Sequence, residues 1–197
     1  PAPEDFLVQL PLIKEVLKAM NITCLENPGY EADDIIGTVS KICEDNGVEC
    51  NILTGDKDDL QLASKLVKIN LVITKMGSTT TTVYDDTGVF EKYGVTPTEF
   101  IDVKGLMGDT SDNIPGVAGI GEKGAQDLIG RFGSIEYIYE NLETIDVKSG
   151  IRAKLEASKE NAFLSKDLGR ICLEAPISTN LSSYSIKNPD AVKASNL

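Results

Sequence analysis

A glycine-punctuated segment near the middle of the chain places the tightest constraint on its fold. Residues 113–134, NIPGVAGIGEKGAQDLIGRFGS, open with closely spaced glycines that mark a tight turn. Glu122 to Phe132 then carries apolar residues at helical spacing. Another helical segment, Thr98 to Met107, precedes the turn, and Thr96 or Thr98 can cap it. The pattern predicts a helix-hairpin-helix.

Such a hairpin suits a sugar-phosphate backbone. Glycines let the main chain approach a phosphate closely, and the free N–H groups at the next helix start bind the anion. These contacts hold the backbone without reading base sequence. A dinucleotide-binding turn is disfavoured because no strand precedes the glycines, and the alternative is an ordinary helical turn. The candidate residues are Gly116, Gly119, Gly121 and Lys123, with Arg131 the weaker source of charge.

The rest of the chain divides into an α/β part and a helical part. Apolar spacing predicts helices over 4–20, 31–46 and 60–64, strands over 48–53 and 67–73, and a further strand or hairpin around Val83-Tyr84. This order predicts a layered α/β domain with a parallel sheet over residues 1–87. Helices over 98–107, 122–132, 135–141 and 151–168 predict a helical lobe over 88–175, and a polar tail or linker over 176–197.

The stretch GYEADDII puts Glu31, Asp33 and Asp34 at the predicted start of a helix. Successive helical residues rotate by about 100°. Glu31 and Asp34 therefore share one flank of the apolar stripe, and Asp33 lies near the other. Acids in a first turn also interact favourably with the helix dipole, by roughly 0.3–1 kcal/mol each. This stretch alone leaves a cation site and a plain helix start as alternatives.

Two further acidic clusters follow at the ends of predicted elements. LTGDKDD places Asp56 and Asp58 where a strand ends, which is where α/β sheets hold ligands. GDTSDN places Asp109 and Asp112 three residues apart. Taken separately, the first can be a solvated loop and the second an Asx turn or helix cap.

Together the three clusters predict a site for hard divalent cations. Crowded carboxylates repel one another and raise their pKa values unless a cation offsets the charge. Oxygen ligands without histidine suit Mg²⁺ or Mn²⁺. The chain has no His, which excludes Ser-His and Cys-His catalysis, and its four cysteines form no CxxC pair, so no zinc site is expected. The formal charge of −12 argues against nucleic acid unless bound cations reduce the negative field.

In these motifs the chain resembles the 5′ nuclease family, most closely the 5′–3′ exonuclease domains of bacterial DNA polymerases I. GYEADD, LTGDKDDLQL and LMGDTSDNIPGVAGIGEKGA occur in the family's order and spacing, and the likeness covers residues 3–176. Asp59 stands where an apolar residue is common. The family also has a first strand with a metal-binding Asp and a basic arch, and we expect about the first third of the usual domain to be absent before Pro1.

The resemblance implies a PIN-like α/β nuclease fold followed by a helix-hairpin-helix lobe. It implies two Mg²⁺ or Mn²⁺ ions, with a possible K⁺ on the hairpin carbonyls. It assigns metal binding to Glu31, Asp33, Asp34, Asp56, Asp58, Asp109 and Asp112, and duplex binding to the hairpin Val117, Gly119, Ile120 and Gly121 alongside Gly116 and Lys123.

The expected function is metal-dependent hydrolysis of DNA phosphodiesters near 5′ ends, by a metal-activated water rather than a side-chain nucleophile, in replication and repair. We expect a monomer that binds DNA with a 5′ flap or nick, without zinc or membrane, in a bacterial cytoplasm near the nucleoid. One alternative is an inactive duplex-binding fragment that uses only the hairpin. Another, a phosphatase or Ca²⁺-binding protein, is disfavoured because no EF-hand spacing is present.

Overall fold

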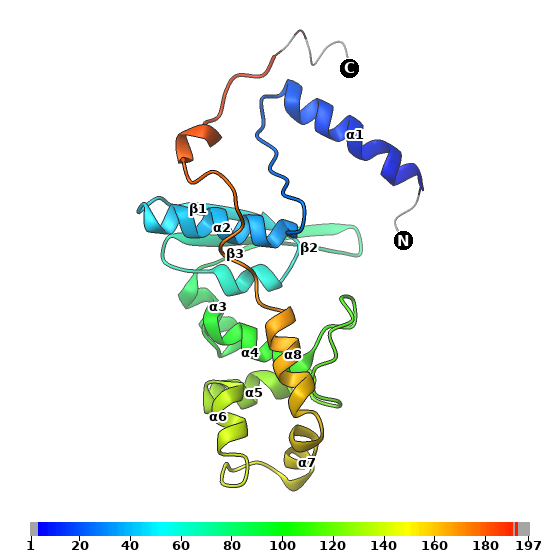
Figure 1. The fold of residues 1–197 in the computed structure, drawn as a ribbon, viewed down its shortest axis with the longest axis vertical. Helices are drawn as coiled ribbons and strands as arrows, with labels where there is room; N and C mark the ends of the chain where they lie inside the picture. Colours follow the sequence, from blue (N-terminus) through cyan, green and yellow to red (C-terminus); the bar gives the residue numbers. More distant parts are fainter. Residues whose placement is uncertain (1–3, 191, 193–197) are drawn as a thin grey trace.

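The computed structural model describes residues 4–190 and 192, and it stacks an α/β layer on a helical lobe (Figure 1). The chain passes from the upper layer into the lobe and then returns across the upper layer. The upper elements are α1 Glu4–Ala19, α2 Ala32–Asp45, β1 Cys50–Thr54, the short 3₁₀ helix η1 Asp58–Leu62, β2 Val67–Lys75 and β3 Ser78–Tyr84. The lower elements are α3 Asp86–Tyr93, α4 Pro97–Met107, α5 Glu122–Phe132, α6 Ile135–Glu140, α7 Ser149–Ala157 and α8 Lys159–Leu168, and η2 Leu181–Tyr184 follows on the return path.

The sheet is mixed, which corrects the prediction of a parallel sheet. β1 and β2 run parallel, with Ile52 opposite Ile69, but β2 and β3 are antiparallel. The reversal takes place at Met76-Gly77, where both residues have positive φ, of 49° and 79°. Positive φ at both central residues is the requirement of a tight hairpin turn whose twist matches the strands. A two-residue connection leaves no room for the crossover that parallel strands need.

Helix α2 covers the sheet and carries the acids of the GYEADDII stretch at its start. Its buried face includes Ile35, Ile42 and Cys43. Gly47, at φ 67°, follows the helix end. Gly37 lies on the opposite side, where a Cβ atom would come within 2.6 Å of the Ile171 side chain. This close approach brings the returning chain over α2 and next to the acids.

The helical lobe is built around α4, whose start Thr96 caps by accepting a hydrogen bond from the Glu99 N–H at 3.3 Å. Helix α5 has the predicted bounds. The segment predicted as one helix over 151–168 is instead two, α7 and α8, because Ser158 has φ −125° and ψ 19°, which is not helical. One hydrophobic core runs from Ile52 in β1 to Ala162 in α8 and joins both layers.

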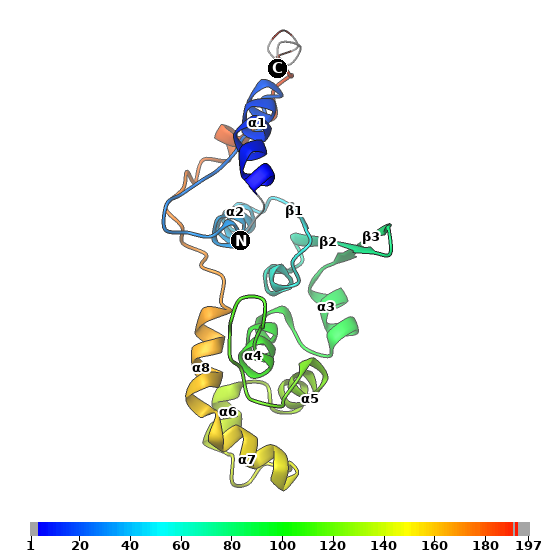
Figure 2. The same cartoon turned by 90° about the vertical axis from the view of Figure 1, so that its right-hand side faces the viewer.

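Two segments complete the upper layer. Helix α1 projects away from the sheet (Figure 2), and its large apolar side chains, such as Phe6, Leu12 and Ile13, are exposed. The chain beyond α8 crosses α2, where the Ala175 N–H donates to the Thr38 hydroxyl at 2.9 Å. The predicted boundary near residues 87–88 falls within α3. Among the described residues, no helix is both long and apolar enough to span a membrane.

Candidate metal centre and nucleic-acid interface

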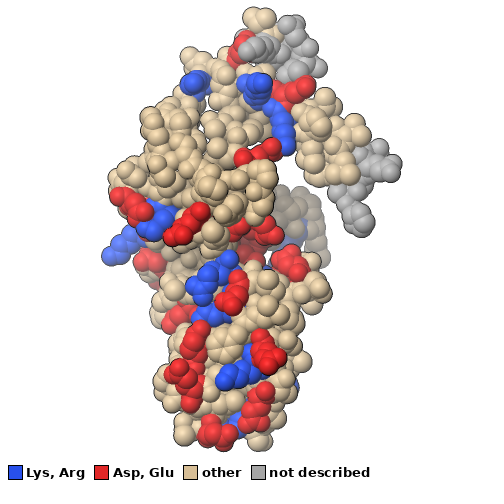
Figure 3. Space-filling model, viewed as in Figure 1, with Lys and Arg blue, Asp and Glu red and all other residues tan. Residues whose placement is uncertain are grey.

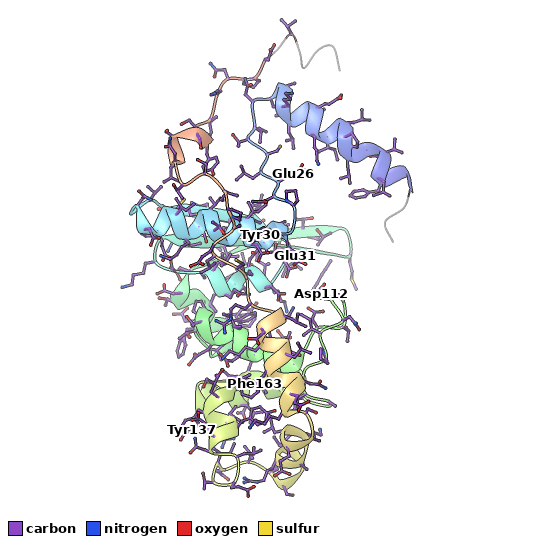
Figure 4. All side chains as sticks on the ribbon, viewed as in Figure 1. Glu26, Tyr30, Glu31, Asp112, Tyr137 and Phe163 are labelled. Carbon is purple, nitrogen blue, oxygen red and sulfur yellow. The ribbon has the colours of Figure 1, made fainter. Side chains whose placement is uncertain are left out.

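A pocket of about 370 Å³ gathers acids from all three clusters between the α/β layer and the lobe. Figure 4 shows Glu31 at the start of α2 above Asp112 on the loop that precedes α5. Figure 3 shows red acidic side chains in this recess, whereas acids and bases alternate over the rest of that face. Acidic residues in the pocket wall are Glu31, Asp33, Asp34, Asp56, Asp58 and Asp112, and the returning chain adds Leu168 to Ile171.

The acids at the end of β1 are held by a compact turn. The Asp56 N–H donates to the Thr54 hydroxyl at 3.0 Å, and the Asp58 N–H donates to the Asp56 carboxylate at 2.9 Å. These bonds start η1 directly after the strand. Asp56 and Asp58 therefore both reach the pocket, as their place at the strand end predicts.

Asp109 and Asp112 lie on the loop between α4 and the hairpin. Backbone bonds between Asp109 and Ile114, at 2.9 and 2.7 Å, close this loop. One carboxylate oxygen of Asp109 accepts bonds from the N–H and the hydroxyl of Ser111. Carboxylate oxygens of Asp58, Asp109 and Asp112 all lie within 4.8 Å of one another, so this trio is spaced to hold a metal ion.

Lys104 is a buried cation that contacts two of these three carboxylates, Asp58 and Asp109. Its ammonium lies 2.6 Å from Asp58 and 2.5 Å from Asp109, with only 3% of its side chain exposed. Burial would lower the pKa of Lys104, but the hydrogen bonds to Asp109 and Asp58 outweigh it and raise that pKa. The Lys104 and Ser111 hydrogen bonds hold the pKa of Asp109 well below its usual range. Burial raises the pKa of Asp58 despite Lys104.

Asp34 stabilises the start of α2 through hydrogen bonds to the backbone. One of its oxygens accepts the Glu31 N–H at 3.0 Å, and the other accepts the Cys172 N–H at 2.8 Å. Asp34 therefore both caps the helix and ties down the returning chain. Asp34 still lines the pocket, and its role as a metal ligand remains a prediction.

The raised pKa of Asp33 reflects the repulsion among the clustered carboxylates. Burial, followed by repulsion from Asp59, Asp56, Asp58 and Glu31, raises the pKa of Asp33 to about 6. Repulsion of this kind persists until a proton or a cation adds positive charge. The pocket is thus adapted to accept positive charge.

The predicted hairpin is pinned at its base by two glycines that touch back to back. A Cβ atom on Gly116 would lie 2.4 Å from the Gly108 nitrogen, and one on Gly108 would lie 2.6 Å from the Ile114 carbonyl oxygen. Both residues have positive φ, of 59° and 67°. Only glycine fits either position, so the Asp109–Asp112 loop and the hairpin share one narrow neck.

The structure divides the predicted duplex-binding residues into two groups. Gly116, Val117 and Ile120 are buried, and their N–H groups donate to Ser165, Leu106 and Val117 respectively. Gly119, Gly121 and Lys123 are exposed. Gly121 is the N-cap of α5 and offers no side-chain cap, so the N–H groups at this helix start face solvent.

Two basic side chains beside the hairpin are already engaged. The Arg131 guanidinium donates to the Asp146 carbonyl at 2.6 Å and lies over the Phe132 ring. The Lys154 ammonium donates to the Gly119 carbonyl at 2.9 Å, on the hairpin where the resemblance implies K⁺. The K⁺ site remains a prediction.

Sequence reasoning missed three charged residues of the site: Lys104, Asp59 and Arg170. Lys104 stands five residues before Asp109 in a helix whose spacing gave no sign of a buried ammonium. Arg170 reaches the pocket on the returning chain, far from the acids in sequence. From the sequence, Asp59 is only one more acid of the LTGDKDD stretch, with no sign that it is buried.

Two family descriptions together match residues 1–192. The description "5'-3' exonuclease, N-terminal resolvase-like domain" matches residues 1–94, and "5'-3' exonuclease, C-terminal SAM fold" matches residues 95–192. The DNA polymerase I of Caldicellulosiruptor bescii is 46% identical over 187 residues, which is 95% of this chain and 22% of that protein. The chain thus spans about a fifth of the length of the curated relatives that it matches.

Solved structures with the same fold come from bacteriophage T5. The T5 5′-exonuclease with bound divalent zinc ions superposes with a TM-score of 0.68 at 26% identity, over 87% of this chain and 63% of that one. A T5 flap endonuclease in a pseudo-enzyme–product complex with DNA and metal ions has a TM-score of 0.63 at 27% identity, over 76% of this chain and 52% of that one.

Proposed function

Because this chain belongs to the 5′–3′ exonuclease family, we propose that it hydrolyses DNA phosphodiesters near 5′ ends with divalent metal ions, as the nuclease domain of a DNA polymerase I. The carboxylate trio Asp58, Asp109 and Asp112 carries this proposal, because it has the spacing of a metal site and opens on the shared acidic pocket. The metal-containing structures of the T5 nucleases support it.

The residues fit hard divalent cations such as Mg²⁺ or Mn²⁺, since the donor set consists of carboxylate oxygens. When bound, such ions lower the pKa of a water and offset charge on the reacting phosphate. Asp58, Asp109 and Asp112 would form one binding group, and Glu31, Asp33, Asp34 and Asp56 the group on the facing wall. We infer two ions from this division of the acids across the pocket.

The chain's own side chains prepare the site before any cation arrives. Lys104 holds Asp58 and Asp109 in place, and Asp34 fixes the start of α2 against the returning chain. Arg170 lines the same pocket and can pair with a phosphate oxygen there. No side chain need act as nucleophile.

The DNA duplex would lie against the exposed part of the hairpin. The open N–H groups at the start of α5, together with Lys123, can bind one strand's phosphates without base readout. This placement weakens the objection from net charge, because six of the 31 acids line the pocket, where bound cations would offset their charge.

The test is cleavage of a 5′-flap DNA with Mg²⁺, using the full-length protein. Asp58→Asn and Asp112→Asn should each reduce cleavage strongly, while Asp146→Asn, an exposed acid in the lobe, serves as the charge control. Binding of duplex DNA without any Mg²⁺-dependent cleavage would instead identify a DNA-binding module. Unchanged cleavage in both site variants would show that the trio holds no catalytic metal.

A further inference from the structure

Asp59 is an acid beside the proposed metal site that does not itself line the pocket. It follows Asp58 in η1 and is fully buried, with 0% of its surface exposed. η1 packs against α2, α4 and β2, so the fully buried Asp59 side chain lies within the protein interior, next in sequence to the pocket acid Asp58. Among the neighbouring charges, Asp59 contributes the largest repulsion to the raised pKa of Asp33.

This buried carboxylate lacks the partners that burial normally requires. Within the described part of the chain, neither of its oxygens has a hydrogen-bond partner by ordinary geometry. Burial raises the pKa of Asp59, and this effect outweighs the hydrogen bonding from the nearby Thr54 hydroxyl that lowers it; Asp56 and Asp58 add repulsion.

Two nearby lysines are committed to other acids. Lys104 binds Asp58 and Asp109. Lys57, two positions before Asp59, forms its ion pair with Glu122 at 3.3 Å. A carboxylate buried without a partner is costly. An apolar residue would fill this buried position without that cost. The acid therefore requires a reason beyond packing.

We propose that Asp59 is a positioning residue for a divalent cation in the pocket, and this rests on the metal centre proposed above. The cation on the pocket side supplies the positive charge that Asp59 lacks within the protein. In return, the buried carboxylate strengthens cation binding from beneath the floor formed by Asp33, Asp56 and Asp58, where water does not screen it. Asp59 thus makes η1 and the start of α2 depend on the bound cation for stability.

The experiment measures Mg²⁺ binding to the DNA-free, full-length protein by isothermal titration calorimetry. Asp59→Asn keeps the shape of the side chain and removes its charge, while Asp59→Leu restores an apolar residue. Both should raise the Mg²⁺ Kd by about 10–100-fold, the usual cost of losing a partner just outside a metal's ligands. Asp146→Asn removes the same charge from a fully exposed side chain and should leave the Kd unchanged.

Hydrogen exchange read by mass spectrometry gives the second readout. Without metal, both Asp59 variants should protect residues 31–45 and 56–66 more than wild type does, because the unpaired charge is gone. Adding Mg²⁺ should then increase protection more in wild type than in the variants. A purely structural residue would change metal-free protection alone.

The outcomes separate this proposal from the metal centre itself. Unchanged Mg²⁺ affinity in Asp59→Asn would overturn the positioning role, as would weakening in Asp59→Leu alone, which would indicate a packing effect. Wild-type protein that binds no Mg²⁺ would overturn the proposed centre, and the role of Asp59 with it.

Discussion

Two buried lysines, each between two carboxylates, lie in different regions of this molecule. Lys166 of α8 binds Asp102 at 2.7 Å and Glu136 at 2.8 Å within the helical lobe. Lys104 of α4 binds Asp58 and Asp109 at similar distances beside the pocket. The pair geometries are alike, but the surroundings are not.

The Lys166 group is complete in itself. Asp102 also accepts the Ile135 N–H at 2.9 Å, so α4, α6 and α8 are joined at one point. Around Lys104, by contrast, Asp33, Asp56 and Asp112 form no ion pair within the described residues, and Arg170 is the one base lining their pocket. One ammonium cannot offset Asp112, Asp56, Asp33 and Asp59 as well. The two groups thus differ in the acids around them: the Lys166 pair stands alone, whereas the Lys104 pair lies next to further carboxylates that could bind a cation.

The largest effect is expected from breaking the Lys166 group. Lys166→Met leaves Asp102, which is 6% exposed, as a buried charge without its cation. The free energy of unfolding should fall by about 3–5 kcal/mol, the usual cost of removing one partner of a buried pair. Urea denaturation measures it. Mg²⁺ should not restore the loss, and restoration would show that the two groups are not distinct.

Breaking the Lys104 group should cost less and should respond to metal. Lys104→Met exposes Asp58 and Asp109 to mutual repulsion, but their side chains are 19% and 22% exposed and can take up water. The expected loss without metal is about 1–3 kcal/mol. Millimolar Mg²⁺ should recover most of it, because a bound cation stabilises the folded state. The same urea titration, with and without Mg²⁺, decides this. Equal losses in both conditions would make Lys104 a purely structural residue like Lys166.

The two regions should also respond differently to pH. The pKa of Asp33 is raised to about 6, so the folded metal-free protein binds this proton more readily than the unfolded chain. Asp33 therefore makes the metal-free fold less stable as the pH rises from about 4 to about 6. Protonation of Asp33 also weakens metal binding below about pH 6, and well below pH 6 the metal affinity should fall by about tenfold for each pH unit.

In the lobe, burial alone would raise the pKa of Glu136, but the Lys166 ammonium outweighs it and lowers that pKa. Its contribution to stability is present above the unfolded pKa and is lost at more acidic pH. Calorimetric Mg²⁺ titrations between pH 5 and 7, with Asp33→Asn as control, test the first effect. An Mg²⁺ affinity that does not change over this range would contradict it.

The smallest effect on stability is expected at Asp112. Its side chain is exposed, so Asp112→Asn should change the free energy of unfolding by no more than about 0.5 kcal/mol. The Mg²⁺ Kd should nevertheless rise, since one of three clustered carboxylates is lost. Comparing urea denaturation with calorimetric titration separates the two. A stability loss as large as that of Lys104→Met would place Asp112 among the structural residues.

Local patterns predicted much of this molecule. Glycine and apolar spacing predicted α5 with its bounds, and the three acidic motifs identified residues that the fold then brings to one pocket. The relation between elements was harder to predict. The antiparallel β3 depends on a turn at Met76-Gly77, and Met is not a residue that usually signals positive φ. The break at Ser158 lies inside a continuous apolar pattern.

Ion pairs between distant elements could not be predicted from the sequence, for a different reason. Lys104 meets Asp58 only because α4 packs on η1, a contact between residues 46 positions apart. Nothing in the local spacing distinguishes Lys104 from an exposed lysine. Asp59 likewise reads as one more polar loop residue until its complete burial is known.

The back-to-back glycines at Gly108 and Gly116 have a consequence for where a strand would be cut. A Cβ atom at either glycine would collide with the other strand of the neck, so the backbone there keeps this close contact only with glycine at both positions. In the proposed function, a duplex gripped at Gly119 and Gly121 would stand at an offset from Asp109 and Asp112 that the covalent length of this segment determines. The length of this segment, rather than any base contact, would then determine which phosphate reaches the acids.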